Sequence, residues 1–464
     1  MSDSEKQNDL LYTTKNVWDK ADNALRDAMM DFSSGYKDFL NNAQTERLAA
    51  KEIVRQAREA GYVDVCEKKT IAAGDKVYFI NRDKAVALLH VGNRPLCEGT
   101  RIVASHIDSP RLDLKPVPLY EESDIAYLKT HYYGGIKKYQ WTAIPLAMYG
   151  VVVTKGKAIE IAVGGPEDDM VFTISDLLPH LAQKQMDKKM RDGIEGESLN
   201  LITGSILGEG ETNRAKIAVM TILNERYGII EEDFVSAELE IVPSFTAKDV
   251  GFDRSMVGGY GQDDRVCSYA GLRALLDVNQ VPEYTAVCLL ADKEEVGSMG
   301  NTGMRSMFFE NIFAEVMEKQ GQYSEIDLRR CFSNSKCLSA DVGAAFDPAY
   351  PSVSERRNTA FFNHGTAICK YTGSRGKAGS SDASAEFVSM IRDIFTGAGV
   401  YWQFCELGSV DMGGGGTVAQ YLANLNIDVI DCGVALLSMH SPYEVAAKAD
   451  IYMTYKGYHA FLKG

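Results

Sequence analysis

The sequence predicts an α/β fold in which a mixed, largely parallel sheet is flanked by helices and carries an inserted β-rich domain. Apolar runs of strand length recur along the chain, and each stops at polar or charged residues. Helical patterns lie between several of these runs, an alternation typical of an open parallel sheet covered by helices. A middle stretch of shorter alternating segments, broken by glycine and proline clusters, interrupts that alternation and predicts the insertion.

The first part of the main domain is expected over residues 1–114. Residues 25–43 and 45–62 place apolar side chains at helical spacing, and residues 76–92 read as a hairpin of two alternating strands. The run RIVAS (101–105) follows and stops at His106. Two helices, a hairpin and a buried strand therefore begin a mixed α/β domain.

The inserted domain is expected over residues 115–250. Its edges are set by the proline-rich segment KPVPLY and the glycine-rich segment MVGGYGQ. Short alternating segments lie between them and make this stretch β-rich: KAIEIAVGG (157–165), MVFTISDL (170–177), AKIAVMTILNE (215–225) and VSAELEIVPS (235–244).

The main domain resumes over residues 251–464. Three further apolar runs, TAVCLLA (285–291), KCLSA (336–340) and IDVIDCGVALLSM (427–439), stop at Asp292, Asp341 and His440. Helical patterns at 265–278 and 380–399 lie between them. These runs predict further buried strands of the same sheet.

Composition and charge exclude several classes of function. Acidic residues number 64 against 49 basic ones, and the formal charge of −15 repels nucleic-acid phosphates and anionic membrane surfaces. No segment has the roughly 18 to 20 apolar residues of a spanning helix, and the polar N-terminal segment lacks the apolar core of a signal peptide. The nine cysteines are scattered without a C-x-x-C pair, so most are expected to be buried thiols. We expect a cytoplasmic protein that binds neither nucleic acid nor membranes.

Polar side chains gather where the apolar runs end. In an open α/β sheet, ligands bind beyond the carboxyl ends of the strands. The residues at these positions are His106, Asp108, Glu294, Glu295, Asp341 and His440, and GQDDRV adds Asp263 and Asp264 at the start of a helix. We expect these residues to converge on one crevice.

Taken singly, each of these residues has a structural explanation. An Asp-Asp pair before a helix is usually an N-cap, a Glu-Glu pair a solvated face, and a lone histidine a hydrogen-bonded, partly buried side chain. Their joint placement favours another interpretation, because carboxylates beside buried strands are costly unless they are paired or bind a metal. Two imidazoles with several carboxylates suit zinc, cobalt or manganese, with zinc the default.

The same residues predict amide hydrolysis. Two adjacent glutamates at a strand end point to opposite sides, so one can ligate a metal while the other faces the substrate water. Two metals about 3.5 to 4 Å apart lower the pKa of a shared water toward 7 and polarise a scissile carbonyl, and a nearby carboxylate takes the proton. Asp108, two residues past His106, is expected to orient that imidazole.

Five motifs in this order, SHIDSPRLDLKP, GQDDR, DKEEVGS, SADVG and LLSMHSPYE, resemble the aspartyl aminopeptidase family of dinuclear zinc metallopeptidases, which have a phosphorylase/hydrolase-like fold. The resemblance runs through most of the chain and implies two zinc ions per subunit. His106 and Asp341 would hold one ion, Glu295 and His440 the other, and Asp263 would bridge them. Glu294 would be the general base, and Asp108 would orient His106.

From the residues alone, either acid of GQDDR could be the bridging ligand. In the family that ligand is followed by Asp or Asn, which favours Asp263 and leaves Asp264 as a supporting or capping residue. The resemblance further implies that residues 115–250 form a dimerisation domain and that the subunits assemble into a closed dodecamer. His180, in LLPHLA, matches a family histidine that reaches a neighbouring subunit's active site, although without the resemblance it reads as a helix-surface imidazole.

A basic, glycine-rich segment in this acidic chain offers cations to an acidic substrate group. It carries Lys370, Arg375 and Lys377, each able to pair with a carboxylate side chain or a terminal carboxylate. Cations on a loop are also commonly only solvated. By position, Lys370 matches the residue that binds the acidic side chain in the family.

One segment departs from the family pattern. Many members carry His-Ala-x-His-Pro-Asn-Tyr after the aspartate ligand, whereas this chain has GAAFDPAY, with Phe346 and Asp347 in place of a histidine and its partner. An apolar ring and a carboxylate near the first subsite disfavour Asp or Glu and tolerate neutral or basic residues. We therefore expect a weakened preference for acidic N-terminal residues.

The sequence as a whole predicts a zinc aminopeptidase that removes N-terminal residues from peptides by attack of a metal-bridged hydroxide. The four consecutive glycines of DMGGGGTVAQYLANL are expected to form a tight turn lining the cleft, because their spacing differs from that of a nucleotide-binding fingerprint. The ligand set alone also fits a two-metal deacylase or a carboxypeptidase. A catalytically inactive scaffold of the same fold is the alternative from another class, and the presence of every ligand and of the base argues against it.

Overall fold

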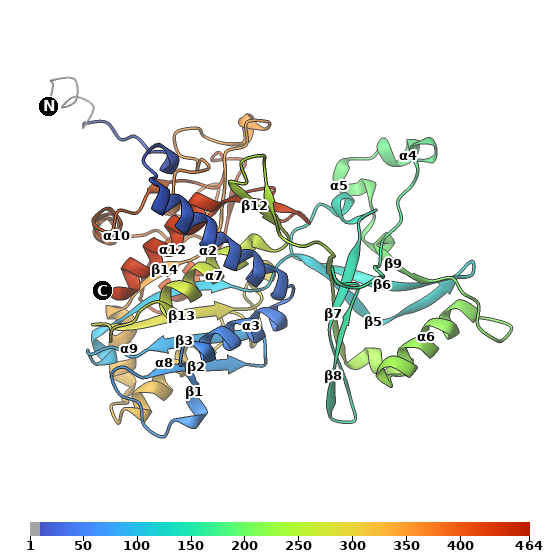
Figure 1. The fold of residues 1–464 in the computed structure, drawn as a ribbon, viewed down its shortest axis with the longest axis horizontal. Helices are drawn as coiled ribbons and strands as arrows, with labels where there is room; N and C mark the ends of the chain where they lie inside the picture. The colour runs from blue at the N-terminus through green and yellow to red at the C-terminus, as the bar shows by residue number, and fades with distance from the viewer. Residues whose placement is uncertain (1–9) are drawn as a thin grey trace.

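The protein has two lobes, seen in a computed structural model that describes residues 10–464 (Figure 1). An α/β lobe is built from both ends of the chain, and a β lobe is formed by residues 111–243. All nine cysteines are free thiols and six of them are buried, as the sequence predicted. Within residues 10–464, no helix combines the length and the apolarity needed to cross a bilayer.

A nine-stranded mixed sheet forms the centre of the α/β lobe, in the order β1-β2-β3-β13-β4-β14-β20-β16-β18. The four parallel strands at its centre are β13 (Thr285–Ala291), β4 (Thr100–His106), β14 (Lys336–Ser339) and β20 (Asp428–Gly433). Antiparallel pairs join this centre to the outer strands β1 (Val63–Asp64), β2 (Lys76–Asn81), β3 (Ala85–His90), β16 (Thr366–Cys369) and β18 (Trp402–Phe404). The predicted mixed, largely parallel sheet is confirmed.

Helices cover both faces of this sheet because its side chains alternate between two apolar cores. On β13, Cys288 and Leu290 belong to one core, and Val287 and Leu289 belong to the other. The first core is closed by α2 (Asn23–Asn42), α3 (Glu46–Glu59), α7 (Gln262–Leu276), α10 (Ala385–Gly397) and α12 (Lys448–Lys463). The second is closed by α8 (Phe308–Lys319), α9 (Glu325–Asn334) and α11 (Ala419–Ala423).

The first two long helices and the hairpin lie where the sequence predicts them. The α2 helix begins at a cap in which the Asp22 side chain accepts a hydrogen bond from the Leu25 N–H. The Thr45 hydroxyl caps α3 in the same way, by accepting from the Leu48 N–H. The predicted hairpin is the antiparallel pair β2–β3.

The β lobe is a six-stranded antiparallel sheet with a core of its own, in which Trp141 is fully buried. The strand order is β8-β7-β10-β5-β6-β9. The strands are β5 (Arg111–Glu122), β6 (Ile125–Tyr133), β7 (Leu146–Thr154), β8 (Lys157–Val163), β9 (Asn200–Gly204) and β10 (Ala237–Pro243). Two short helices, α4 (Gln183–Met186) and α5 (Met190–Gly193), lie at one end of this lobe (Figure 1).

Two of the four segments that the sequence assigned to the β-rich stretch are not strands. Residues 215–225 belong to a helix, α6 (Arg214–Tyr227), because alanine, lysine, methionine and leucine favour a helix and the half-buried Val219, Met220 and Leu223 meet the core at helical spacing. Residues 170–177 form only isolated bridges at Phe172 and Thr173. The strand prediction was wrong for residues 215–225, which are helical. For residues 170–177 a continuous strand was predicted, whereas only isolated bridges form.

A second, smaller sheet changes the position of His440. Its strands are β11 (Lys248–Val250), β12 (Met256–Gly259), β22 (Glu444–Ala447), β21 (Ala435–Leu437) and β15 (Gly343–Ala344). The apolar run 427–439 is therefore split between β20 of the main sheet and β21 of this one. Gly433 lies at the break, where a Cβ would collide with the Asp341 carbonyl. His440 consequently lies in the turn between β21 and β22 and not, as predicted, at the end of a main-sheet strand.

Candidate metal centre and substrate cavity

Three neighbouring strands of the main sheet end at the candidate site. His106 is the last residue of β4 and pairs in register with Ala291, the last residue of β13. After β13 the chain turns through Lys293, whose φ is +71°, into a helical turn that begins at Glu294. Asp341 follows the end of β14 by two residues. Carboxylates therefore approach His106 from the strands on both sides of β4.

Asp263 and His440 reach the same place from outside the main sheet. Asp263 lies in the first turn of α7. The Glu444 carboxylate accepts hydrogen bonds from the backbone N–H groups of His440, at 2.8 Å, and Asp263, at 3.1 Å. His440 Nδ1 donates to the Gly135 carbonyl of the β lobe at 2.8 Å, which leaves Nε2 available to a metal.

The carboxylate of Asp263 lies between the two imidazoles. Its Oδ1 is 3.2 Å from His106 Nε2, and its Oδ2 is 3.1 Å from His440 Nε2. Asp341 Oδ1 lies 3.9 Å from His106 Nε2, and Glu295 Oε2 lies 3.5 Å from His440 Nε2. The structure thus brings together all five residues that the sequence proposed as ligands.

The donor set fits divalent cations. Within residues 10–464, His106 Nε2, Asp263 Oδ1 and Glu295 Oε1 are buried side-chain atoms without a hydrogen-bond partner. Buried polar atoms without a partner are costly, and a bound cation would supply the missing partner. Two groups of side chains, His106 with Glu294 and Asp341, and His106 with Asp263 and Glu295, each offer ligand atoms within 4.8 Å of one another. Imidazole nitrogens and carboxylate oxygens are ligands of zinc.

Burial perturbs the titration of the whole cluster. Burial and the surrounding carboxylates raise the pKa of Glu295 and of Asp341 well above the usual range, and raise the pKa of Glu294 to about 7. Burial opposes a charge on His440, yet Asp263 and Glu295 raise the pKa of this imidazole to about 10. The raised pKa values favour the protonated form of these side chains. Bound divalent cations would neutralise the carboxylates in place of those protons.

Asp108 lies behind His106, as the sequence predicted for the residue that orients it. His106 Nδ1 is 3.0 Å from the Asp108 carbonyl oxygen and 3.3 Å from its Oδ1. The next acid of GQDDR behaves differently from Asp263. Asp264 is fully buried, burial raises its pKa, and among the described residues neither of its side-chain oxygens has a hydrogen-bond partner. The peptide bond between Asp263 and Asp264 is cis.

A cavity of about 880 Å³ opens over the metal centre. Asp263, Glu294 and His440 line its floor, and residues 413–416 line its wall. A Cβ on Gly413 would collide with the Leu407 carbonyl, so this close backbone contact requires glycine. The glycine run lines the cleft as predicted, but it is not a tight turn, because Gly414–Gly415 form a short strand, β19, that pairs with β17 (Gly373–Ser374).

The basic segment contributes two cations to this cavity. Arg375 and Lys377 are among the described residues that line it, whereas Lys370, the residue favoured by sequence position, is exposed and is not among them. Lys377 Nζ lies 3.1 Å from Asp382 Oδ2 and 3.6 Å from the centre of the Tyr371 ring.

Phe346 and Asp347 also fall outside the described lining of the cavity. The Phe346 ring packs against Phe361 with 5.4 Å between ring centres. The Asp347 side chain accepts a hydrogen bond from the Ala349 N–H at 2.9 Å. Both residues thus stabilise their own loop, and the structure does not place them beside the first subsite.

His180 lies in the β lobe, apart from the candidate ligands. It is exposed, in a short 3-10 helix (Pro179–Leu181), and does not line the cavity of its own chain as far as the described residues show. The structure therefore brings the five candidate ligands, Asp108 and Glu294 together, and leaves His180 apart from them.

Sequence reasoning missed Glu444. It is fully buried, and burial raises its pKa to about 8, while its two oxygens hold the backbone of Asp263 and His440. The available signal was an acid four residues after His440 in LLSMHSPYE, at the start of an apolar strand. Gly135 was also missed, because only the folded chain brings its carbonyl to His440.

Comparisons with known proteins agree with this geometry. The family described as aminopeptidase I zinc metalloprotease (M18) matches residues 39–462. A probable M18 family aminopeptidase 1 of Clostridium acetobutylicum is 51% identical over 462 residues, which are 98% of this chain and 99% of the relative. The crystal structure of the M18-family aminopeptidase of Thermotoga maritima is 45% identical, with a TM-score of 0.94, over 98% of this chain and 100% of that one.

The fold extends to more distant proteins. The structure of the S. cerevisiae mApe1 dodecamer is 18% identical, with a TM-score of 0.74, over 93% of this chain and 96% of that one. The family match and the close relatives confirm the resemblance read from the five motifs, and they favour the aminopeptidase over the other hydrolases and the inactive scaffold. The chain belongs to the M18 family and is a zinc aminopeptidase.

Proposed function

We propose that this aminopeptidase holds two zinc ions per chain and removes the N-terminal residue of short peptides with Glu294 as the general base. The observation that carries the proposal is the Asp263 carboxylate, which lies 3.2 Å from one imidazole and 3.1 Å from the other. Asp341 beside His106 and Glu295 beside His440 complete two half-sites. When bound, zinc would polarise the scissile carbonyl and lower the pKa of water toward neutrality, as cobalt or manganese also would.

Glu294 has the position and the basicity for proton transfer. Its carboxylate lines the cavity, and its Oε2 lies 3.9 Å from His106 Nε2. Burial raises its pKa to about 7, close to the value that suits a base working at neutral pH. Glu294 would take a proton from the attacking water and deliver it to the amine of the leaving peptide.

The substrate side chain would meet the basic segment. Arg375 and Lys377 line the cavity, but Lys377 is already paired with Asp382. We therefore retain a weak preference for acidic N-terminal residues as part of the proposal, with Lys370 as the candidate that sequence position supports. Rates of cleavage of Asp-, Leu- and Lys-anilides would test it: similar kcat/KM values are expected, and a strong preference for Asp would contradict it.

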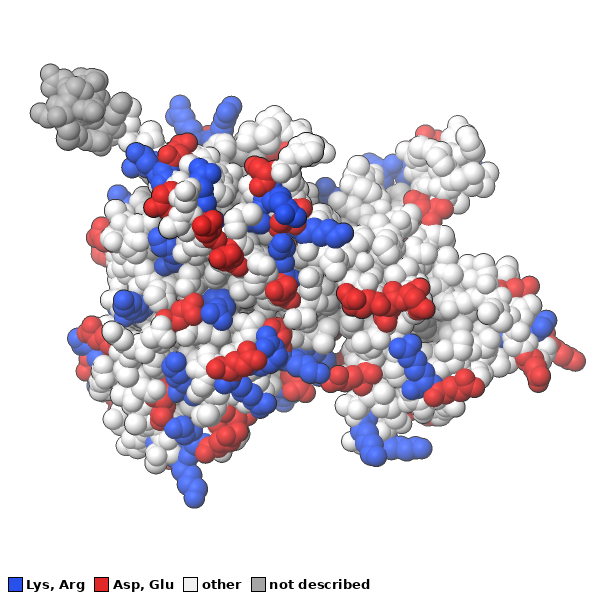
Figure 2. Space-filling view, in the orientation of Figure 1, with Lys and Arg blue, Asp and Glu red and all other residues white. Residues whose placement is uncertain are grey.

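We also propose that residues 115–250 mediate dimerisation within a dodecamer, with residues 1–114 and 251–464 forming the catalytic domain. Exposed apolar side chains on the β lobe support this: Leu177, Leu178, Leu181, Met186 and Met190 are at least half exposed. On the face that Figure 2 shows, the upper part of this lobe is largely uncharged, although the same segment also carries exposed charged residues, namely Lys184, Asp187, Lys188, Lys189, Arg191 and Asp192. The chain also shares its fold with the S. cerevisiae mApe1 dodecamer, which supports the proposed assembly into a dodecamer.

Chelation followed by metal reconstitution tests the reaction. The protein would be assayed on a peptide with a free N-terminus and on its N-acetylated form, before and after chelation and with zinc, cobalt or manganese restored. We expect two zinc ions per chain, cleavage of the free peptide alone, and loss and recovery of activity with the metal. Equal cleavage of the acetylated peptide would contradict the requirement for a free amine.

A Glu294→Gln variant tests the base. Because proton transfer by a positioned carboxylate contributes roughly 10²- to 10⁴-fold, we expect kcat to fall in that range while the zinc content stays unchanged. Glu310→Gln, on the surface of α8, is the control. Retention of wild-type kcat by Glu294→Gln would remove this residue from the mechanism.

A further inference from the structure

A buried chain of contacts runs from the metal centre into the β lobe. It begins at the Asp108 carboxylate, which is fully buried. This carboxylate accepts hydrogen bonds from the backbone N–H of Glu294 at 3.1 Å and of Glu295 at 3.2 Å. Asp108 therefore holds the backbone of both adjacent glutamates as well as the His106 ring, and its own orientation fixes three side chains of the centre.

The β lobe supplies one further donor to Asp108. The Tyr133 hydroxyl, at the end of β6, donates to Asp108 Oδ2 at 2.8 Å. Burial and the Asp108 charge raise the pKa of Tyr133 well above its usual value, so the phenol stays protonated and remains a donor. A buried carboxylate needs such donors, because each hydrogen bond to the charged form replaces one lost from water.

Arg111 holds the Tyr133 ring in place. The two residues lie directly opposite each other on β5 and β6, and the guanidinium carbon is 3.9 Å from the ring centre. A planar guanidinium stacks on an aromatic face more effectively than an ammonium does. Arg111 is itself almost completely buried, so its position depends on the acids around it.

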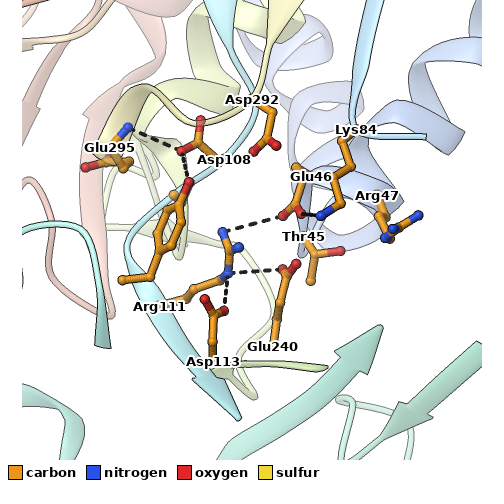
Figure 3. Close-up of polar contacts among 12 residues, drawn as sticks. Thr45, Glu46, Arg47, Lys84, Asp108, Arg111, Asp113, Glu240, Asp292 and Glu295 are labelled. Atoms are coloured by element: carbon orange, nitrogen blue, oxygen red, sulfur yellow. Dashed lines mark hydrogen bonds and ion pairs between the residues drawn. The ribbon is translucent and has the colours of Figure 1, made fainter. Parts of the chain in front are cut away.

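Three acids from three elements fix Arg111 (Figure 3). Arg111 Nε lies 2.8 Å from Asp113 Oδ1 and 3.3 Å from Glu240 Oε2, and Nη1 lies 3.5 Å from Glu46 Oε2. Burial raises the pKa of Glu240 well above its usual range, whereas Arg111 helps to hold the pKa of Glu46 at about 2. Glu240 is therefore favoured in its neutral form, which limits the negative charge facing Arg111.

From these contacts we infer that Tyr133, backed by Arg111, is a positioning residue of the metal centre that the β lobe contributes. The inference rests on the proposed roles of Asp108, Glu294 and Glu295. Loss of the Tyr133 hydroxyl would leave the Asp108 carboxylate with two backbone donors and the His106 ring, and would remove its hydrogen bond to the β lobe. The common anchor of the glutamate backbone and the His106 ring would then be held less firmly, and the ligand geometry would loosen.

A Tyr133→Phe variant isolates the hydroxyl, since the ring and its contact with Arg111 remain. We expect kcat to fall about 10- to 100-fold with little change in KM, as is usual when a group that supports a metal ligand is removed. Tyr127→Phe is the matched control, because Tyr127 lies on the same strand, is also half-buried, and stacks on Tyr120 away from the centre. Thermal unfolding should be alike in the two variants.

Two readouts do not depend on peptide cleavage. The visible absorption spectrum of the cobalt-substituted protein should change in Tyr133→Phe and not in Tyr127→Phe, and the affinity for zinc should fall only in the former. Arg111→Lys, which keeps the charge but not the stacked plane, should give an intermediate effect. Identical spectra, zinc affinity and kcat in the two tyrosine variants would overturn the inference. If the wild type bound metal but cleaved no peptide, the proposed reaction would be wrong. The comparison of cobalt spectra and zinc affinity would still test whether Tyr133 positions the metal centre.

Discussion

Among single residues, Asp263 has the most demanding position in the centre. It faces both imidazoles at about equal distance, and its backbone N–H is held by Glu444. Asp264, its neighbour in the sequence, is equally buried but is held in the neutral form by that burial. The two acids of GQDDR are alike in the sequence, and only their surroundings separate a charged carboxylate that faces both imidazoles from a protonated one.

This difference predicts opposite outcomes for two conservative substitutions. Asp263→Asn should weaken the binding of both zinc ions by at least about tenfold, because a neutral amide cannot serve two cations as a carboxylate does. Asp264→Asn replaces a neutral carboxyl by a neutral amide and should keep both ions. Zinc per chain after equilibrium dialysis checks both, and full zinc content in Asp263→Asn would show that this residue does not bridge.

At the scale of elements, helix α12 is tied to strand β16 by a buried acid. Asp450, in the first turn of α12, accepts hydrogen bonds from the N–H groups of Asn363 at 2.8 Å and Gly365 at 2.7 Å. Both donors lie in the segment that leads into β16. Burial raises the pKa of Asp450 to about 8 in spite of these hydrogen bonds.

Stability should therefore depend on pH at this contact. Between the usual pKa of 3.8 and about 8, the folded chain holds a proton that the unfolded chain has released, so the free energy of unfolding falls as the pH rises through this range. Asp450→Asn lacks this proton. Urea unfolding at pH 5 to 9 should show the wild type losing stability relative to the variant up to about pH 8 and no further. A constant difference across this range would contradict the prediction, and the exposed Asp393→Asn serves as control.

The elements also show what the sequence could and could not predict. The strands β4, β13 and β14 were predictable because each is a buried apolar run that stops at polar or charged residues. Residues 215–225 were not, because their apolar positions fit both a strand and a helix, and packing on the β-lobe sheet decided for the helix. The split of residues 427–439 between two sheets depends on a close backbone contact at Gly433, which no local pattern reveals.

The residues of the candidate site also divide into those that could be predicted from the sequence and those that could not. The candidate ligands lie in short motifs, most of them just after a strand, which is why the sequence could propose them. Other supporting residues make contacts between distant parts of the chain, and these are Glu444, Tyr133 and Arg111. For example, the Tyr133 hydroxyl of the β lobe donates a hydrogen bond to the Asp108 carboxylate beside the main sheet. Lys370 and the pair Phe346 and Asp347 were chosen by position along the chain, and the cavity is lined by other residues.

For the whole molecule, the two lobes differ in what they expose and in what they carry. The α/β lobe carries the candidate ligands and most of the cavity, and the β lobe exposes apolar side chains around His180. In a single chain His180 is not among the described residues that line the cavity. Its predicted role therefore requires a second copy of the protein, and activity should depend on assembly.

A His180→Ala variant tests that dependence. We expect it to keep its zinc and its oligomeric state, measured by elemental analysis and sedimentation, while kcat falls at least about tenfold, as for loss of one positioned hydrogen-bond donor. Lys184→Ala, in the adjacent helix α4, is the control. Wild-type kcat in an assembled His180→Ala protein would remove this residue from the reaction.

The junction between the lobes has a consequence for attempts to shorten the protein. Strand β5 starts three residues after Asp108, and the Gly135 carbonyl that anchors His440 comes from the loop that follows β6. Replacing residues 111–243 by a linker would remove both the Tyr133 hydrogen bond to the Asp108 carboxylate and the Gly135 hydrogen bond to the His440 imidazole. We therefore expect that a minimal enzyme cannot be obtained by trimming this lobe, since the lobe supports the residues of the candidate metal centre.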